Sequence, residues 1–152
     1  MLKKIVKSLA LFTTLVLLVT GCGSKPIVET SLTTNQGGID QVITFFSQGD
    51  KVVRQTTTNT VSYTALGVST EEEARALLDP IGEDFQGING LTHSFTYSDE
   101  QAVEYLEIDY SIADLSEISK LTGSQFSGNT DKGISLAKSI EMLEKQGFTK
   151  VS

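Results

Sequence analysis

The stretch that decides the fold reads LTHSFTYSDEQAVEYLEIDY and runs from Leu91 to Tyr110. Apolar or aromatic residues alternate with threonine and serine as far as Tyr97, residues 98–100 are typical of a turn, and alternation resumes from Ala102. A period of two residues indicates a strand with one covered face. The stretch therefore predicts a β-hairpin.

A second hairpin is predicted upstream of this one. An apolar strand at residues 42–46 and a valine- and threonine-rich run at residues 51–63 flank the turn signal Gln48-Gly49-Asp50. β-branched side chains favour a half-solvated strand. The hydroxyl- and amide-rich residues 55–60 are expected on an exposed strand face; the alternative is an edge or groove that pairs with an extended peptide or a glycan.

A helix is expected between the two hairpins. Thr70 followed by Glu73 fits a capping box, and apolar residues recur at helical spacing as far as Ile88. Pro80 lies inside this pattern. Proline removes a helical hydrogen bond, so Pro80 should kink the helix or end its first segment near Asp79.

Two further helices are predicted after the second hairpin. Residues 114–121 are expected to form a short helix, and Thr130 or Asp131 is expected to cap a last helix that ends at Lys145. Gly147 follows at the position where a left-handed residue closes a helix.

The resulting order is ββα-ββαα, which indicates an α+β domain with helices packed on an antiparallel sheet of two β-hairpins. We expect one domain at residues 39–152, and the two ββα halves could be an internal repeat. The single cysteine, Cys22, leaves the domain without a disulfide, so the core alone must hold it.

The N-terminus has the layout of a bacterial lipoprotein signal. Residues 1–21 contain three lysines and then an apolar segment, and the tetrad Val19-Thr20-Gly21-Cys22 reads as a lipobox. Cleavage between Gly21 and Cys22 would leave Cys22 with an S-diacylglycerol and an N-acyl chain such as palmitate. An ordinary signal peptide or a retained spanning helix is the alternative, but a spanning helix needs about 20 apolar residues.

This anchor predicts where the domain lies. Cys22 and a flexible tether over residues 22–38 should hold the domain on the outer side of a membrane, which is the outer membrane if the cell has one. The chain has 12 basic and 19 acidic residues, and without the signal 9 basic and 19 acidic residues give a net charge of −10. Nucleic acid is therefore not an expected partner.

The order of several short segments resembles the YehR-like family of small bacterial lipoproteins. The likeness covers roughly residues 39–151 and rests on Gly49-Asp50-Lys51-Val52, Thr70 to Pro80 with its Leu78-Asp79-Pro80, Thr96-Tyr97-Ser98-Asp99, Lys132-Gly133-Ile134-Ser135 and Gly147-Phe148-Thr149-Lys150-Val151. The resemblance implies a lipid-anchored envelope protein with a compact α+β domain, no established biochemical role and no catalytic motif.

One histidine and one carboxylate are predicted to point toward the core. His93 is the only histidine and alternates with apolar residues, so it is expected to be packed or half-buried. Glu104 falls on the apolar face of its strand. A buried carboxylate needs a partner, and Arg54 or Arg75 could supply it.

Glu107 and Asp109 share the other face of that strand. Neighbouring carboxylates can serve acid/base chemistry or bind calcium, which makes this pair a weak candidate metal site. A solvated strand face is the simpler interpretation. No cofactor is expected, because the sequence has no phosphate-binding glycine loop and no nucleophile elbow.

The function expected from these features is a non-enzymatic, lipid-anchored domain that binds a protein or a small ligand in the cell envelope. One alternative is a hydrolase that uses Glu104, Glu107 or Asp109. Another is that the released signal fragment, Leu15 to Gly21, acts as a peptide pheromone.

Overall fold

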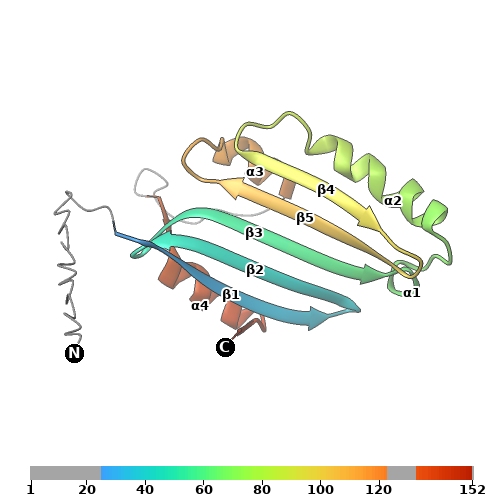
Figure 1. Cartoon of the computed structure of the whole chain (residues 1–152), viewed down its shortest axis with the longest axis horizontal. Helices are drawn as coiled ribbons and strands as arrows, with labels where there is room; N and C mark the ends of the chain where they lie inside the picture. Colours follow the sequence, from blue (N-terminus) through green and yellow to red (C-terminus); the bar gives the residue numbers. More distant parts are fainter. Residues whose placement is uncertain (1–24, 123–132, 152) are drawn as a thin grey trace, which may run out of the picture.

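The computed structural model describes residues 25–122 and 133–151. Its central element is an antiparallel sheet (Figure 1). Within these residues five long strands lie in the order β4-β5-β3-β2-β1, with short β7 beside β1 and short β6 beside β3. The strands are β1 (Ile27–Gln36), β2 (Ile39–Gln48), β3 (Lys51–Ser62), β4 (Leu91–Tyr97), β5 (Gln101–Asp109), β6 (Ile134–Ser135) and β7 (Thr149–Lys150).

The structure contains both predicted hairpins. In β4–β5, Tyr97 lies opposite Ala102, and β2 joins β3 through a turn in which Gly49 has a φ of +67°. β3 is paired with β2 on one side and with β5 on the other. The prediction that residues 55–60 could form a sheet edge is therefore wrong, because both hydrogen-bonding sides of β3 are occupied.

The predicted tether is shorter than expected, because most of residues 22–38 belongs to the sheet. β1 pairs along its whole length with β2, from Ile27 opposite Gln48 to Gln36 opposite Ile39. Leu32 in the middle of β1 is 0% exposed, which ties the strand to the core. The domain therefore begins before residue 39, and β1 was missed because its other side chains are mostly polar.

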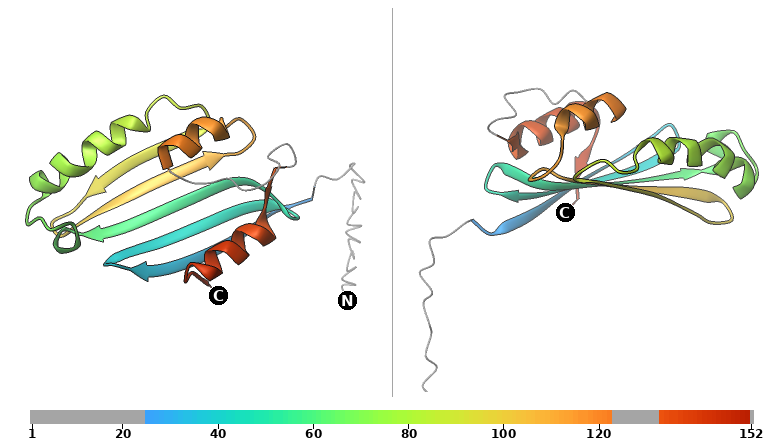
Figure 2. Two further views of the ribbon diagram at one scale, coloured as in Figure 1. Left: turned by 180° about the vertical axis from the view of Figure 1, so that it is seen from behind. Right: turned by 90° about the horizontal axis from the view of Figure 1, so that it is seen from above.

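The larger helices all lie on one face of the sheet (Figure 2). They are α2 (Glu71–Asp84), α3 (Leu115–Thr122) and α4 (Leu136–Lys145), and the single-turn α1 (Tyr63–Leu66) follows β3. We call the helix-covered side the closed face and the other side the open face. No helix among the described residues is long and apolar enough to cross a bilayer.

The start of α2 is as predicted. Thr70 Oγ1 accepts the Glu73 N–H at 3.2 Å, and the Glu73 carboxylate accepts the N–H of Ser69 at 2.8 Å. The helix continues through Pro80 to Asp84, so the expected end near Asp79 is wrong. Pro80 lies on the solvent side of α2, where water can satisfy the carbonyl that proline leaves without a helical donor.

The last helix is shorter than predicted and has a different cap. α4 begins at Leu136, and Ser135 Oγ accepts the Lys138 N–H at 3.3 Å. The caps predicted at residues 130 and 131 lie outside the described residues. The end is as expected, because Gly147 has a φ of +92° and the buried Phe148 donates its N–H to the last turn of the helix.

Three apolar clusters join the helices to the closed face. Together they confirm the α+β class, although the order βββααββαβαβ contains more strands than expected. One cluster places α4 on β1–β3, one places α2 on β3 and β5, and one joins α3 to β5. Their buried members are, in turn, Leu32, Ile43, Phe45, Val52, Leu143 and Phe148; Val61, Tyr63, Ala74, Leu78 and Ala102; and Ile88, Ile108 and Ile118.

Candidate functional site

A cleft of about 760 Å³ lies on the closed face between α2 and the end of α4. We call it the α2–α4 cleft. Its floor is formed by strands β1, β2, β3 and β5, and its walls include Leu78 and Ile81 of α2 and Phe148 after α4. The volume is within the range of about 300–1,000 Å³ that is typical of small-ligand sites.

A polar triad of His93, Asn59 and Glu104 lies at the floor of the cleft: Asn59 and Glu104 line the cleft, and His93 is buried behind Glu104. The register places Glu104 opposite Asn59 on β3 and opposite Phe95 on β4, so His93 is its diagonal neighbour. His93 Nε2 lies 2.7 Å from Glu104 Oε1, and Asn59 Nδ2 donates to Glu104 Oε2 at 2.7 Å. Both carboxylate oxygens of Glu104 are thus held by neighbouring strands.

The histidine of the triad is enclosed on the side away from Glu104. Its side chain is 0% exposed, while that of Glu104 is 23% exposed. Phe85 stacks on the imidazole at 4.5 Å between centroids, and Phe95 meets it edge-on at 4.9 Å. Because a carboxylate can only accept a hydrogen bond, Nε2 carries the proton, and Nδ1 is buried without a hydrogen-bond partner.

A second buried atom without a partner is Asn59 Oδ1. Asn59 is also a cleft-lining residue, and its amide nitrogen is already committed to Glu104. A buried acceptor that makes no hydrogen bond costs about 1–3 kcal/mol. The floor of the cleft therefore has an unpaired acceptor, buried beside the Glu104 carboxylate.

The predictions for His93 and Glu104 are thus partly right. His93 is buried as expected, and Glu104 points inward and has partners. The partners proposed for it are wrong: Arg54 pairs with Glu107 at 3.5 Å, and Arg75 pairs with Glu71 at 2.7 Å. Arg54 lies on the open face, so the sheet itself separates it from Glu104.

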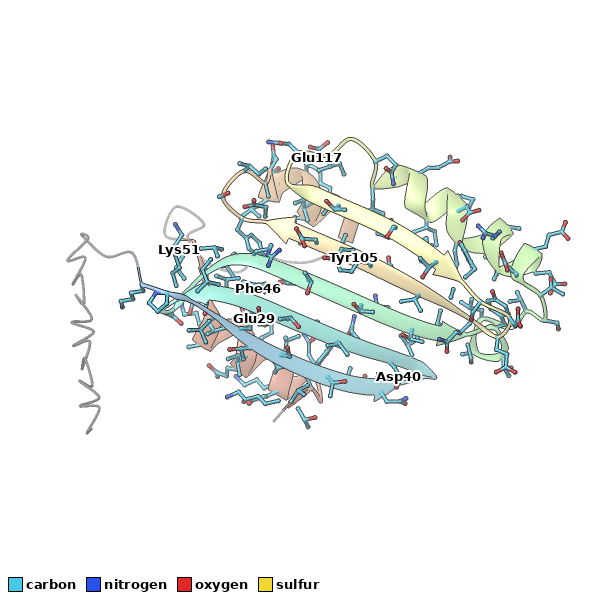
Figure 3. All side chains as sticks on the ribbon, in the orientation of Figure 1. Glu29, Asp40, Phe46, Lys51, Tyr105 and Glu117 are labelled. Atoms are coloured by element: carbon cyan, nitrogen blue, oxygen red, sulfur yellow. The ribbon has the colours of Figure 1, made fainter. Side chains whose placement is uncertain are left out.

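The open face carries Glu107 and Asp109, on the side of the sheet away from Glu104. Figure 3 shows Phe46 and Tyr105 on the same face. Tyr105 donates its hydroxyl hydrogen to Glu107 at 2.7 Å, and this hydrogen bond raises the pKa of Tyr105. Asp109 instead accepts from the side chain and backbone of Ser111, which lower its pKa.

The partners of Glu107 and Asp109 give no support to a metal site or to a hydrolase built from these carboxylates. Glu107 and Asp109 each have other partners, and the described residues contain no group of three acidic, histidine or cysteine side chains that could hold a metal ion. Glu104 is the only carboxylate among the residues that line the α2–α4 cleft. The carboxylate pair that the hydrolase hypothesis requires does not converge there.

The open face is rich in hydroxyl groups, because the strands that form it contain many threonine and serine residues. Hydroxyl side chains from several strands form it, among them Ser31, Thr44, Thr56, Thr58, Thr60, Thr92, Ser94 and Thr96. Ser31 and Thr44 hydrogen-bond across β1–β2 at 2.8 Å. No described helix covers this face (Figure 2).

The lipobox, Gly21 and Cys22, and the proposed pheromone segment Leu15 to Gly21 lie outside the described residues. A model of the family described as "Protein of unknown function (DUF1307)" matches residues 29–149.

The chain belongs to the DUF1307 family.

DUF1307 relatives include named lipoproteins. The chain is 41% identical to the uncharacterized lipoprotein Lmo0207 of Listeria monocytogenes, over 100% of this chain and 98% of that protein. It is 29% identical to the uncharacterized lipoprotein YehR of Escherichia coli, over 95% and 94% of the two chains. The resemblance to YehR-like lipoproteins is thus confirmed.

Solved structures support the fold of this DUF1307 member. The NMR structure of E. coli YehR superimposes with a TM-score of 0.74 at 26% identity, covering 85% of this chain and 94% of that chain. An NMR structure of a protein from Streptococcus pneumoniae gives a TM-score of 0.60 at 13% identity, covering 99% and 97%, and shows likeness of fold alone.

Proposed function

We propose that this protein is a non-enzymatic binding domain of the cell envelope, anchored by a lipid on Cys22, whose site is the α2–α4 cleft. One observation carries the proposal: a cleft of about 760 Å³ has apolar walls and a floor in which Glu104 and the unpartnered acceptor of Asn59 lie together. Apolar walls around a few fixed polar groups are the usual composition of a small-ligand site.

The short connection to Cys22 supports a fixed orientation of this site. β1 begins at Ile27, so four residues separate the lipidated cysteine from the sheet, and the five steps along the chain span at most about 17 Å. The turn of β2–β3 lies at the same end as the start of β1, because Ile27 is opposite Gln48. This end carries Lys51 and Lys25, and it should face the lipid headgroups (Figure 3).

The cleft opens at the other end of the sheet. Gln36 and Ile39, which flank the β1–β2 turn, line it. Ten residues of β1 span about 30 Å, so the cleft is held well above the membrane surface. An envelope protein that collects or presents a ligand needs this arrangement, with the anchor at one end and the site at the other.

A crosslinking experiment in cells tests whether the cleft is the site. A photo-reactive amino acid replaces Ile81, which lines the cleft, or Leu77, which lies one turn away on α2 outside it. These side chains are 47% and 51% exposed, so their access to solvent is matched. After irradiation, intact-mass measurement of the purified protein should show a discrete small-molecule adduct at position 81 only.

Three results would contradict the proposal. Equal adducts from both positions would indicate a nonspecific apolar contact along α2. The absence of any adduct at position 81, together with adducts from a matched probe on the open face at Val42, would move the binding site to the other face of the sheet. A Cys22→Ser variant that still incorporates a labelled fatty acid would reject the lipid anchor on Cys22.

A further inference from the structure

The side chains that line the α2–α4 cleft include one acidic group and no basic group. Among the thirteen residues that line it, Glu104 is the only one with an ionisable side chain. Its partner His93 donates through Nε2 and has its Nδ1 buried between aromatic rings without an acceptor.

Among the described residues, His93 is the only basic side chain within ion-pair distance of Glu104, and it is fully enclosed on the far side of the carboxylate. Asn59 donates one hydrogen bond to Glu104, but it adds no positive charge. The Glu104 side chain is 23% exposed. In a partly enclosed cleft, where the effective dielectric constant is below that of water, this carboxylate should attract a cation.

The hydrogen-bonding groups point to the same class of ligand. Asn59 Oδ1 is an acceptor with no donor, and it belongs to the residue that also contacts Glu104. A primary ammonium group carries several N–H donors and no acceptor, so it suits the exposed part of the Glu104 carboxylate beside this amide. An anionic head group would instead be repelled by the Glu104 carboxylate, and a head group with acceptors alone could not donate a hydrogen bond to it.

Apolar side chains enclose the rest of the cleft. Leu78, Phe95 and Phe148 are inner wall residues, while Ile39 and Ile81 are 41% and 47% exposed at its rim. Each square ångström of apolar surface that a ligand covers contributes about 25 cal/mol. The exposed rim residues therefore favour a ligand with an apolar body.

We infer that the α2–α4 cleft binds an amphipathic amine, with its protonated nitrogen on the Glu104 carboxylate and its apolar body against α2 and Phe148. This inference rests on the proposed function, because it names the ligand chemistry of the same cleft. It assigns Glu104 the role of ligand anchor and gives His93 the role of positioning its carboxylate.

Three probes with one body and different head groups test this chemistry. They are 4-phenylbutylamine, 4-phenylbutanol and 4-phenylbutanoate, titrated into ¹⁵N-labelled chain from residue 23 onward, which contains every described element. Amide shifts in the cleft-lining strands report binding there. The amine should bind at least about ten-fold more tightly than the alcohol, a difference of about 1.4 kcal/mol, and the carboxylate should bind most weakly.

Two charge-neutralising variants locate the effect. Glu104→Gln keeps the size of the side chain and should abolish the preference for amine over alcohol while leaving alcohol binding unchanged. Glu29→Gln is the matched control, because Glu29 is exposed on β1 and points to the open face (Figure 3). It should change none of the three affinities.

The salt dependence of the wild-type protein gives a readout that needs no variant. Amine binding should weaken between low and high ionic strength, and alcohol binding should not. Equal binding of amine and alcohol in the cleft would overturn the inference and leave the proposed site intact. Failure of all three probes to shift cleft resonances would also overturn it, while the crosslinking experiment judges the site independently.

Discussion

Replacing Leu32 with alanine tests the most consequential structural finding, that β1 is part of the domain. Leu32 is 0% exposed and belongs to the cluster that joins α4 to the sheet. The substitution removes three carbon atoms, which at about 0.8 kcal/mol each amounts to about 2.4 kcal/mol of lost burial. The remaining cavity raises the expected loss in the free energy of unfolding to about 3–4 kcal/mol.

Urea unfolding of the soluble chain from residue 23 onward measures this loss. The midpoint should fall while the dependence of the free energy on urea stays the same, and the melting temperature should fall by about 12 °C. Ile27→Ala is the control, since that side chain is 57% exposed on the same strand. It should change the free energy of unfolding by less than about 0.5 kcal/mol.

The two variants separate the two views of residues 22–38. A flexible tether makes no contact with the core, so Leu32→Ala would then be as harmless as Ile27→Ala. Equal stability of the two variants, or a Leu32→Ala loss within about 0.5 kcal/mol of zero, would refute the assignment of β1 to the sheet.

Three further predictions follow from particular contacts. Gly90→Ala should destabilise the fold by at least about 1 kcal/mol more than Gly87→Ala. Both glycines have positive φ, but only a Cβ at position 90 would meet backbone atoms, at 2.6 Å. Equal losses in the free energy of unfolding, measured by thermal unfolding, would contradict the clash. Hydrogen bonds from the first turn of α4 hold the pKa of Asp50 below its usual value of 3.8. Asp50 thus stabilises the fold above about pH 4 and loses this effect as the pH falls through its lowered pKa, so Asp50→Asn should flatten the acid limb of a stability-against-pH curve, and an unchanged limb would exclude this contribution. Finally, a fluorophore on an introduced Lys51→Cys should be quenched by headgroup-labelled lipid more than one on Asp99→Cys, at the far β4–β5 turn, and equal quenching would reject the proposed orientation.

The hairpin of residues 91–110 could be predicted because its information is local. Alternation with a period of two residues defines both strands, and the turn residues fix where they reverse. The capping box at Thr70 and the left-handed Gly147 were equally readable, because a cap depends on atoms within a few residues of one another.

β1 could not be identified in the same way. Its only fully buried side chain is Leu32, and its neighbours on the closed face, Thr30 and Thr34, are polar. Such a strand forms because β2 offers it a complete ladder of backbone partners. Propensity is a weak signal for a strand whose stability depends on its neighbours.

The triad at the floor of the cleft shows which site residues could be predicted from the sequence. His93 and Glu104 each stood out as polar residues on apolar strand faces, and the turn at residues 98–100 sets a register that makes them diagonal neighbours. Pairing them required only that register. Asn59 was harder to find, because it reaches Glu104 from β3, which is 45 residues away in the chain.

The sequence by itself predicted the lipid anchor and determined the α+β class, the two hairpins and the family likeness, because each depends on residues close together in the chain. Only the tertiary structure decided which face the helices cover, and with it that Glu104 is enclosed while Glu107 and Asp109 are on the open face. The reason is geometric: alternation assigns residues to two faces, but the packing of α2 and α4 on one of them places the α2–α4 cleft there.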